Sequence, residues 1–235
     1  MCSGRVDLEF VLRAFSNGTD GVFIGGCRLN ECNYITHGNY HALTMVLLLK
    51  RIMEHIGLNP ERLRIEFMSS AEGVAFAEVM SEFGNEVTKI GPLGKAEGIE
   101  PNELKSKLAE VTKLVPYIKV VNQEKLATRL RNPEEYDKLF TKEDIDKLFS
   151  EVISYYIDPA KCQACMTCAK QCPADAIVGG KNQIHVIDQA KCTKCGTCFE
   201  VCPTKFRAVT KISGEPVPAP IPEEARTIVR ERKQK

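Results

Sequence analysis

Cysteine is the residue type in this 235-residue chain that points most clearly to chemistry, because its thiolate binds metals. The 11 cysteines fall into two groups. Eight of them lie between residues 162 and 202, and three lie between residues 2 and 32. The N-terminal sequence lacks the apolar core and cleavage site of a signal peptide, so we expect a cytoplasmic protein with reduced thiols. Reduced cysteines at close spacing indicate bound metal.

Residues 162–173 and 192–203 repeat one motif, C-x2-C-x2-C-x3-C-P, with an offset of 30 residues. In this spacing three cysteines of a tight loop hold one [4Fe–4S] cluster, and the fourth cysteine ligates the other cluster. The motif therefore predicts two clusters with crossed ligand sets. The first set is Cys162, Cys165, Cys168 and Cys202, and the second is Cys192, Cys195, Cys198 and Cys172.

Zinc is the alternative for closely spaced cysteines, but tetrahedral zinc sites rarely use three cysteines in succession followed by Cys-Pro. Between the repeats, "AIVGGKNQIHVIDQAKC" predicts a strand, a Gly-Gly turn and a second strand. Residues 155–211 closely resemble a bacterial two-cluster ferredoxin. Because the cluster positions are already filled, we expect His185 to be a surface residue and not a ligand.

The N-terminal 93 residues alternate between helical and extended patterns. Leu8, Val11, Leu12 and Phe15 share one face of a predicted helix, and residues 20–26 form a short apolar run typical of a buried strand. A helix at 39–58 that is closed by Gly57, a strand at 62–70 and a helix at 72–91 follow. Alternating strands and helices with short connections predict an α/β domain with a parallel, three-layer sheet.

Cys27 and Cys32 follow the first predicted strand in the loop "GGCRLNECNYITHGNY". Ligands bind at this carboxyl end of strands in open α/β sheets. The glycines match neither G-x-G-x-x-G nor G-K-[ST], so nucleotide binding by this loop is only weakly indicated. Cys2 is suited to the corresponding position after a preceding strand.

"MCSGRVD", "GGCRLNEC", "GNYHA" and "GLNPERLRIEFMSSAEG" resemble the delta subunit of methyl-viologen-reducing hydrogenase. That family accompanies heterodisulfide reductase in anaerobes. The resemblance implies a [2Fe–2S] cluster, with electrons passing from a hydrogenase or formate dehydrogenase to the flavin subunit of the reductase. Cys2, Cys27 and Cys32 match cluster cysteines of the family.

The family's upstream strand and helix, with a C-x-x-C-like motif, have no counterpart here, and three thiolates do not complete a standard [2Fe–2S] site. Three explanations stay open: an upstream start, a ligand from a partner chain, or loss of the cluster. His37 and His41 are better explained as surface or helix-capping residues than as ligands. Tyr34 and Tyr40 are expected in the core or an interface.

Two amphipathic helices are predicted in a charged connector at 94–154, one over 100–115 and one over 141–157, with Asn132-Pro133 separating helices. Thr141 and Asp144 form a capping-box pattern at the start of the second helix. Residues 212–235 form a proline-rich tail, which we expect to be an extended arm that wraps a neighbouring subunit or stays disordered.

The net charge of +1 suggests no nucleic-acid partner, and no apolar run is long enough to span a bilayer. We find no nucleophile–base constellation and no flavin or nicotinamide fingerprint. The chain is thus expected to be a non-catalytic electron-transfer subunit of a redox complex, in which electron bifurcation can occur. The alternatives are a stand-alone flavin- or small-molecule-binding oxidoreductase with a built-in ferredoxin, and a freely diffusing ferredoxin with a regulatory domain.

Overall fold

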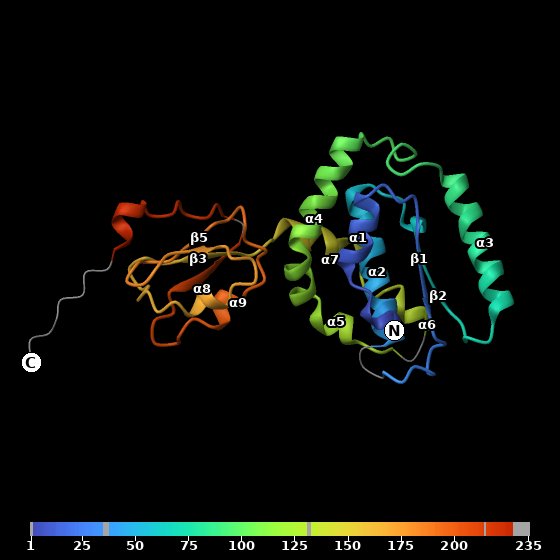
Figure 1. Ribbon diagram of the computed structural model, residues 1–235, viewed down its shortest axis with the longest axis horizontal. Helices are drawn as coiled ribbons and strands as arrows, with labels where there is room; N and C mark the ends of the chain where they lie inside the picture. The colour runs from blue at the N-terminus through green and yellow to red at the C-terminus, as the bar shows by residue number, and fades with distance from the viewer. Residues whose placement is uncertain (1, 35–37, 131–132, 214, 228–235) are drawn as a thin grey trace, which may run out of the picture. The chain divides into compact units, whose positions relative to one another are not determined.

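The computed structural model describes residues 2–34, 38–130, 133–213 and 215–227 (Figure 1). It divides the chain into two compact units, Met1–Leu148 and Phe149–Lys235. Residues 94–148, expected to form most of a connector, belong to the first unit. Among the described residues, no helix combines the length and the apolar character that crossing a membrane requires.

The first unit contains two parallel strands that pair in register from Val22 with Leu63 to Gly26 with Phe67. The predicted alternation of helix and strand is confirmed, and Gly57 ends the long helix in a left-handed conformation. The elements up to residue 90 are η1 (Ser3–Arg5), α1 (Leu8–Ser16), β1 (Val22–Gly26), α2 (Asn39–Ile56), η2 (Pro60–Arg62), β2 (Leu63–Phe67) and α3 (Gly73–Ile90).

The core of this unit is the apolar face of α1 and α2. The predicted face of α1 is confirmed, because its buried residues are Leu8, Val11, Leu12 and Phe15. Each fully buried side chain of this size stabilises the fold by about 1.5–3 kcal/mol. α4 (Pro101–Val121) packs on α1, and α5 (Gln123–Ala127) packs on α2. Most apolar residues of these helices are therefore buried within their own unit, whereas Val120 and Val121 are exposed.

Arg62 joins the start of β2 to the segment that follows α3. Its guanidinium is fully buried and donates to Glu97 at 2.6 Å, to the carbonyl oxygens of Asp20 and Gly91 at 2.9 and 2.8 Å, and to Pro92 O at 3.2 Å. Buried charges persist in a fold when they are paired and fully hydrogen-bonded. This network therefore joins the start of β2 to the loop before β1 and to the segment after α3.

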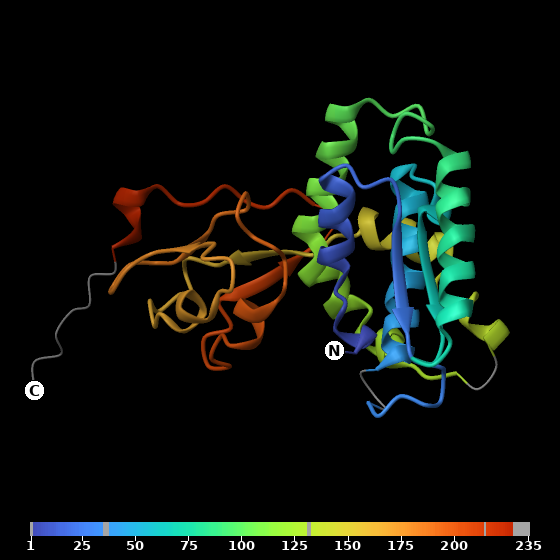
Figure 2. The same cartoon turned by 45° about the vertical axis from the view of Figure 1, so that its right-hand side comes forward.

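α3 packs on the strands mainly through aromatic rings. The ring of Phe23 on β1 lies 6.4 Å from that of Phe76 and 5.7 Å from that of Phe83. α1 and α3 lie on opposite sides of the two strands (Figure 2). The parallel α/β arrangement is confirmed, and the full three-layer sheet stays a prediction.

The second predicted connector helix ends earlier than its periodicity suggested. α7 spans Lys142–Ser150, and the expected capping box is confirmed, because Thr141 N donates to Asp144 Oδ2 at 3.0 Å and Asp144 N to Thr141 Oγ1 at 3.1 Å. Residues 154–157 form strand β3 instead of helix. Two tyrosines and an isoleucine favour a strand once a pairing partner is present. Asn132 lies outside the described residues, and α6 spans Pro133–Tyr136.

The second unit is a small antiparallel fold. β3 pairs with β6, and β4 pairs with β5 across the predicted Gly-Gly turn, so the expected strand–turn–strand is confirmed. Cysteines and a few apolar side chains make up its core. The elements are β3 (Ser154–Ile157), α8 (Thr167–Gln171), β4 (Ile177–Val178), β5 (Val186–Ile187), α9 (Thr197–Glu200), β6 (Val209–Ile212) and η3 (Glu223–Arg226).

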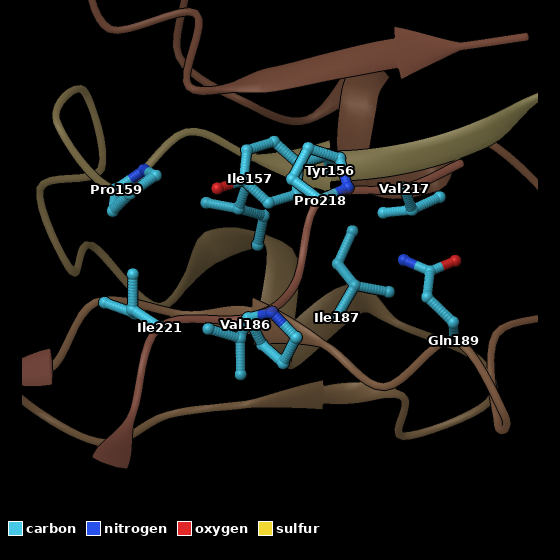
Figure 3. A pocket seen from close by; sticks show the side chains of 10 residues that line it. Tyr156, Ile157, Pro159, Val186, Ile187, Gln189, Val217, Pro218 and Ile221 are labelled. Atoms are coloured by element: carbon cyan, nitrogen blue, oxygen red, sulfur yellow. The ribbon is translucent and has the colours of Figure 1, made fainter. Parts of the chain in front are cut away.

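The proline-rich tail, as far as residue 227, folds back on its own unit, in contrast to the expected arm around a neighbour. Val217 and Ile221 line a cavity with Tyr156 and Val186 (Figure 3). Ile184 N donates to Arg226 O at 2.7 Å. The apolar residues between the prolines gain burial on the sheet, which explains the difference.

Candidate iron-sulfur sites

The first predicted ligand set lines one cavity of the second unit. Cys162, Cys165, Cys168 and Cys202 surround about 320 Å³ of empty space, which includes the solvent at its mouth. Ile157, Phe206 and Val209 supply apolar walls. Cys202 comes from the second motif, so the cavity combines both repeats as the crossed pattern requires.

The second set lines a separate cavity of about 300 Å³. Its cysteines are Cys172, Cys192, Cys195 and Cys198, and Tyr155 and Ile187 lie among the apolar walls. Within the described residues, no three His, Cys, Asp or Glu side chains converge tightly enough to hold one metal ion.

The cysteine loops are tight because residues between the cysteines adopt left-handed backbone conformations. Ala164 and Met166 have φ values of 51° and 65°, and Lys194 and Gly196, 30 residues later, have 57° and 84°. Residues other than glycine seldom take this conformation, and such strain is typical of functional sites. The repeat therefore extends from the sequence to the backbone.

The buried thiols hold their protons tightly in the absence of metal. Burial, followed by the charges of Cys162 and Cys165, raises the pKa of Cys168 to about 11. Burial and neighbouring cysteines likewise raise the pKa of Cys198 to about 12. For the exposed Cys165, hydrogen bonds with Thr167 outweigh burial and lower the pKa. Ligation must displace the protons of the two buried thiols, so cluster binding is linked to folding of this unit.

The prediction that His185 lies at the surface is wrong. His185 is only 1% exposed and lines the first cavity. Its Nδ1 lies 3.9 Å from Cys162 Sγ. Burial lowers the pKa of His185. The hairpin of β4 and β5 folds this residue inward, an effect that local sequence does not reveal.

The N-terminal cysteines come together although Cys2 and Cys27 are 25 positions apart in the sequence. Cys2 Sγ lies 3.8 Å from Cys32 Sγ, and the Cys27 and Cys32 thiols are close enough to shift each other's pKa. Burial, then the neighbouring thiols, raises the pKa of Cys27. For Cys32, backbone N–H groups of Tyr34 and Asn39 outweigh burial and lower the pKa. Donors aimed at a sulfur favour its thiolate form.

Three residues that the sequence did not single out hold this loop. Asn39, the buried first residue of α2, donates to Cys27 O at 2.8 Å and to Arg28 O at 2.7 Å. Gly38 leaves room for Cys32, because a Cβ built there would lie 2.4 Å from Cys32 Sγ. Glu72 accepts from Arg28 Nε at 3.0 Å and from Ser69 N at 2.6 Å. These contacts span distant segments, so only the fold reveals them.

The other candidates have different roles. His41 Nδ1 lies 3.1 Å from Leu126 O, a contact that joins α2 to α5. His37 lies outside the described residues. Tyr40 stacks on Tyr136 with ring centres 6.1 Å apart, as expected for a packing residue, whereas Tyr34 is exposed. Ser3 Oγ is buried next to Cys2 and has no hydrogen-bond partner among the described residues.

Cysteine-lined cavities on a ferredoxin-like frame define an iron–sulfur protein. Comparison with known families agrees, because a 4Fe-4S dicluster domain matches residues 156–209. Residues 1–91 match the family described as methyl-viologen-reducing hydrogenase, delta subunit. By its N-terminal domain the chain belongs to that family.

Individual relatives match the same N-terminal segment. An iron-sulfur subunit of the F420-non-reducing hydrogenase of Archaeoglobus profundus is 50% identical over 91 residues, which are 39% of this chain and 66% of that protein. The corresponding vhu iron-sulfur subunit of Methanopyrus kandleri is 38% identical over 92 residues, 39% of this chain and 69% of that protein.

A second kind of relative is a larger protein. It is one of the subunits of the ferredoxin/F(420)H(2)-dependent CoB-CoM heterodisulfide reductase of Methanosarcina acetivorans, and it is 49% identical over 94 residues, 40% of this chain. The chain spans only 12% of the length of that protein. The same domain thus occurs in a hydrogenase subunit and within a heterodisulfide reductase subunit.

Proposed function

We propose that this protein is a cytoplasmic electron-transfer subunit of an anaerobic redox complex. It passes single electrons through two [4Fe–4S] clusters between a hydrogenase or formate dehydrogenase and a flavin-containing, heterodisulfide-reductase-like module. That module is the place where electron bifurcation can occur. The chain itself catalyses no reaction on a substrate.

The observation that carries this proposal is the crossed lining of the two cavities of the second unit. Each cavity has three cysteines from one repeat and the fourth from the other. A cubane held by four cysteines gains and loses single electrons and offers no iron site to a substrate. The protein contributes the four thiolates, and apolar side chains such as Phe206 and Val209 line the first cavity beside them.

The N-terminal unit is proposed to dock this pair of clusters onto a partner and to add a [2Fe–2S] cluster. Three observations support a bound group there: the gathered sulfurs of Cys2, Cys27 and Cys32, the space left by Gly38, and the buried Ser3 hydroxyl, which has no partner among the described residues. The fourth ligand is proposed to come from outside the described residues.

The choice of partners rests on the relatives. One kind is a hydrogenase subunit, and the other is a heterodisulfide reductase subunit that includes the same domain. A domain that occurs on both sides of such a junction is suited to joining them. A chain that fuses it to a ferredoxin unit extends the path for electrons.

The proposal is tested by mixing anaerobically purified protein with a reduced hydrogenase or formate dehydrogenase and following cluster reduction by EPR. We expect reduction of both clusters, and reoxidation when a heterodisulfide-reductase-like flavoprotein is added. Bound flavin in the purified chain would instead favour the stand-alone oxidoreductase. A stable monomer that binds neither protein would contradict the subunit role.

Iron analysis of the same samples tests the N-terminal site separately. Two cubanes require about eight irons per chain, and a [2Fe–2S] cluster adds about two. After the partner's own iron is subtracted, we expect about ten irons per chain of this protein in the complex, and about eight per chain after Cys27→Ser. About eight in both samples would contradict the third cluster and leave the ferredoxin unit unaffected.

A further inference from the structure

His185 is the most deeply buried polar residue of the second unit, with 1% of its surface exposed. It lies directly before β5 and lines the first cavity together with Cys162, Cys165 and Cys168. Its Nδ1 is 3.9 Å from Cys162 Sγ. A polar side chain in such a position is costly unless its nitrogens have partners.

The imidazole is held from two further sides. Its Nε2 lies 3.1 Å from Met166 Sδ, and Met166 is itself in the left-handed loop between Cys165 and Cys168. Gly179, with a φ of +148°, packs against the ring, because a Cβ there would lie 3.0 Å from His185 Cδ2. The ring therefore has one orientation, with Nδ1 toward the cysteine.

The repeat shows that this contact belongs to one half only. An offset of 30 residues relates His185 to Tyr155 and Met166 to Gly196. Tyr155 lines the second cavity, and its hydroxyl lies over Gly196, at 2.8 Å from a Cβ built there. In that half, backbone amides of Ala176 and Lys194 donate to Cys172 and Cys192 at 3.3 and 3.4 Å. Each half also has a threonine beside a cysteine, Thr167 near Cys165 and Thr197 Oγ1 at 3.3 Å from Cys195 Sγ, so the histidine contact is what distinguishes the first half.

A cysteine that ligates iron is a thiolate, which accepts hydrogen bonds and donates none. A neutral imidazole has a single N–H, and Met166 Sδ can only accept, so Nδ1 and Nε2 cannot both donate. The charged thiolate is the stronger acceptor, so the tautomer with hydrogen on Nδ1 is favoured, and the Nε2–Met166 Sδ approach is then a packing contact. Negative charge on the ligand sulfurs increases when a cluster is reduced, so a donor stabilises the reduced form more than the oxidised form. Hydrogen bonds to the sulfurs are one of the ways in which proteins set cluster potentials.

We propose that His185 donates its Nδ1–H to Cys162 Sγ and raises the reduction potential of the first [4Fe–4S] cluster. His185 is a positioning and tuning residue and not a ligand, and its role rests on the proposed pair of clusters. It allows the reduction potential of one cluster to be set independently of that of the other.

The test is an EPR-monitored redox titration of the anaerobic full chain and its variants. His185→Phe keeps an aromatic ring in the buried position and removes the donor. We expect one of the two reduction steps to become about tenfold less favourable, which lowers its reduction potential by about 59 mV for one electron. His185→Asn offers an amide N–H near the position of Nδ1 and should restore most of this shift. Tyr155→Phe is the matched change in the other half. It should leave unchanged the potential of the reduction step that shifts in His185→Phe.

A second measurement needs no variant. Pulsed EPR on wild-type protein with 15N-labelled histidine should show a weak nitrogen coupling to one reduced cluster, and His185→Phe should remove it. Unchanged titration steps in His185→Phe with about eight irons would overturn the tuning role, as would the absence of the nitrogen coupling. Wild-type iron far below eight would instead overturn the two clusters themselves.

Discussion

The two units of the chain bring cysteine side chains together in different ways. In the second unit, each cavity has four cysteines from two copies of one local motif. In the first unit, three cysteines meet from separate segments, and the loop depends on Asn39 and Gly38 to hold them. The first arrangement brings four cysteines to each cavity, whereas the [2Fe–2S] cluster proposed for the second would need a further ligand. The comparison shows that clustered cysteines can form the core of one domain and lie in a surface loop of another.

Iron removal should separate the two regions most strongly. The core of the second unit consists largely of cysteines, whereas the residues that α1 and α2 bury are mainly apolar and include no cysteine. Chelation under denaturant-free conditions should therefore unfold the second unit and leave the first folded. Hydrogen exchange measured by mass spectrometry should show lost protection in β3 and β6 and retained protection in α2. Equal loss in both units would remove the distinction.

Removal of a crossed ligand should halve the iron content. Cys202 lies in the second motif but lines the first cavity. We expect Cys202→Ala to lower the iron from about eight to about four per chain and to remove the EPR signal of the first cluster. Cys2→Ala is the matched change in the other region and should leave the isolated chain near eight. Loss of the second signal in Cys202→Ala would show that the ligand sets are not crossed.

Arg62 should matter most to the stability of the first unit. Arg62→Ala leaves Glu97 with a buried, unpaired carboxylate, and the expected loss is about 3–5 kcal/mol in the free energy of unfolding. Arg64, two residues later, pairs with the more exposed Glu66 and Glu86, so Arg64→Ala should cost about 0–1 kcal/mol. Chemical denaturation of the first unit, followed by hydrogen exchange in α2, compares the two. Similar losses would mean that burial of the pair is unimportant.

Gly38 should distinguish a cradle for Cys32 from an ordinary turn. A methyl group there would meet Cys32 Sγ at 2.4 Å and Tyr34 O at 2.3 Å, so Gly38→Ala must shift the loop, at a cost of about 1–3 kcal/mol. At Gly25 the nearest atom to an added Cβ is 3.6 Å away, and Gly25→Ala is the control. Thiol-labelling rates of Cys32 should rise in Gly38→Ala only. An unchanged rate would show that the loop adapts freely.

The smallest expected effect is on the pH dependence of the first unit. Although burial opposes it, the hydrogen bond from Arg62 lowers the pKa of Glu97 below 4.5, the value of a free glutamate. The stabilisation is therefore complete above pH 4.5 and is lost as the pH falls through the folded pKa. The stability difference between wild type and Glu97→Gln should shrink over that range, as measured by denaturation at successive pH values. A difference that grows on acidification would reverse the sign.

Local sequence was sufficient wherever the structure depends on neighbours along the chain. The face of α1, the end of α2 at Gly57 and the capping box at Thr141 are confirmed because short-range periodicity and capping determine them. The helix predicted over 141–157 extended too far because residues 154–157 gain more from pairing with β6 than from helical spacing. Pairing between segments this far apart in the chain is not visible in a window of sequence.

The site residues follow the same division. The cysteine motifs predicted which thiols would share a cavity, since the repeat contains the crossing within itself. His185 was expected at the surface because nothing in its local sequence indicates that the β4–β5 hairpin turns it toward Cys162. Asn39 and Gly38 were missed for the same reason, because their roles depend on a loop that precedes them. Residues that support a site from another segment need the fold to reveal them.

The measurement that tests the central claim most directly is an iron and acid-labile sulfide count on the isolated chain, purified without oxygen. We expect about eight irons and eight sulfides per chain, with the EPR signals of two reduced [4Fe–4S] clusters. About two zinc ions and no sulfide, or about four irons in a single cluster, would contradict the two-cluster electron path.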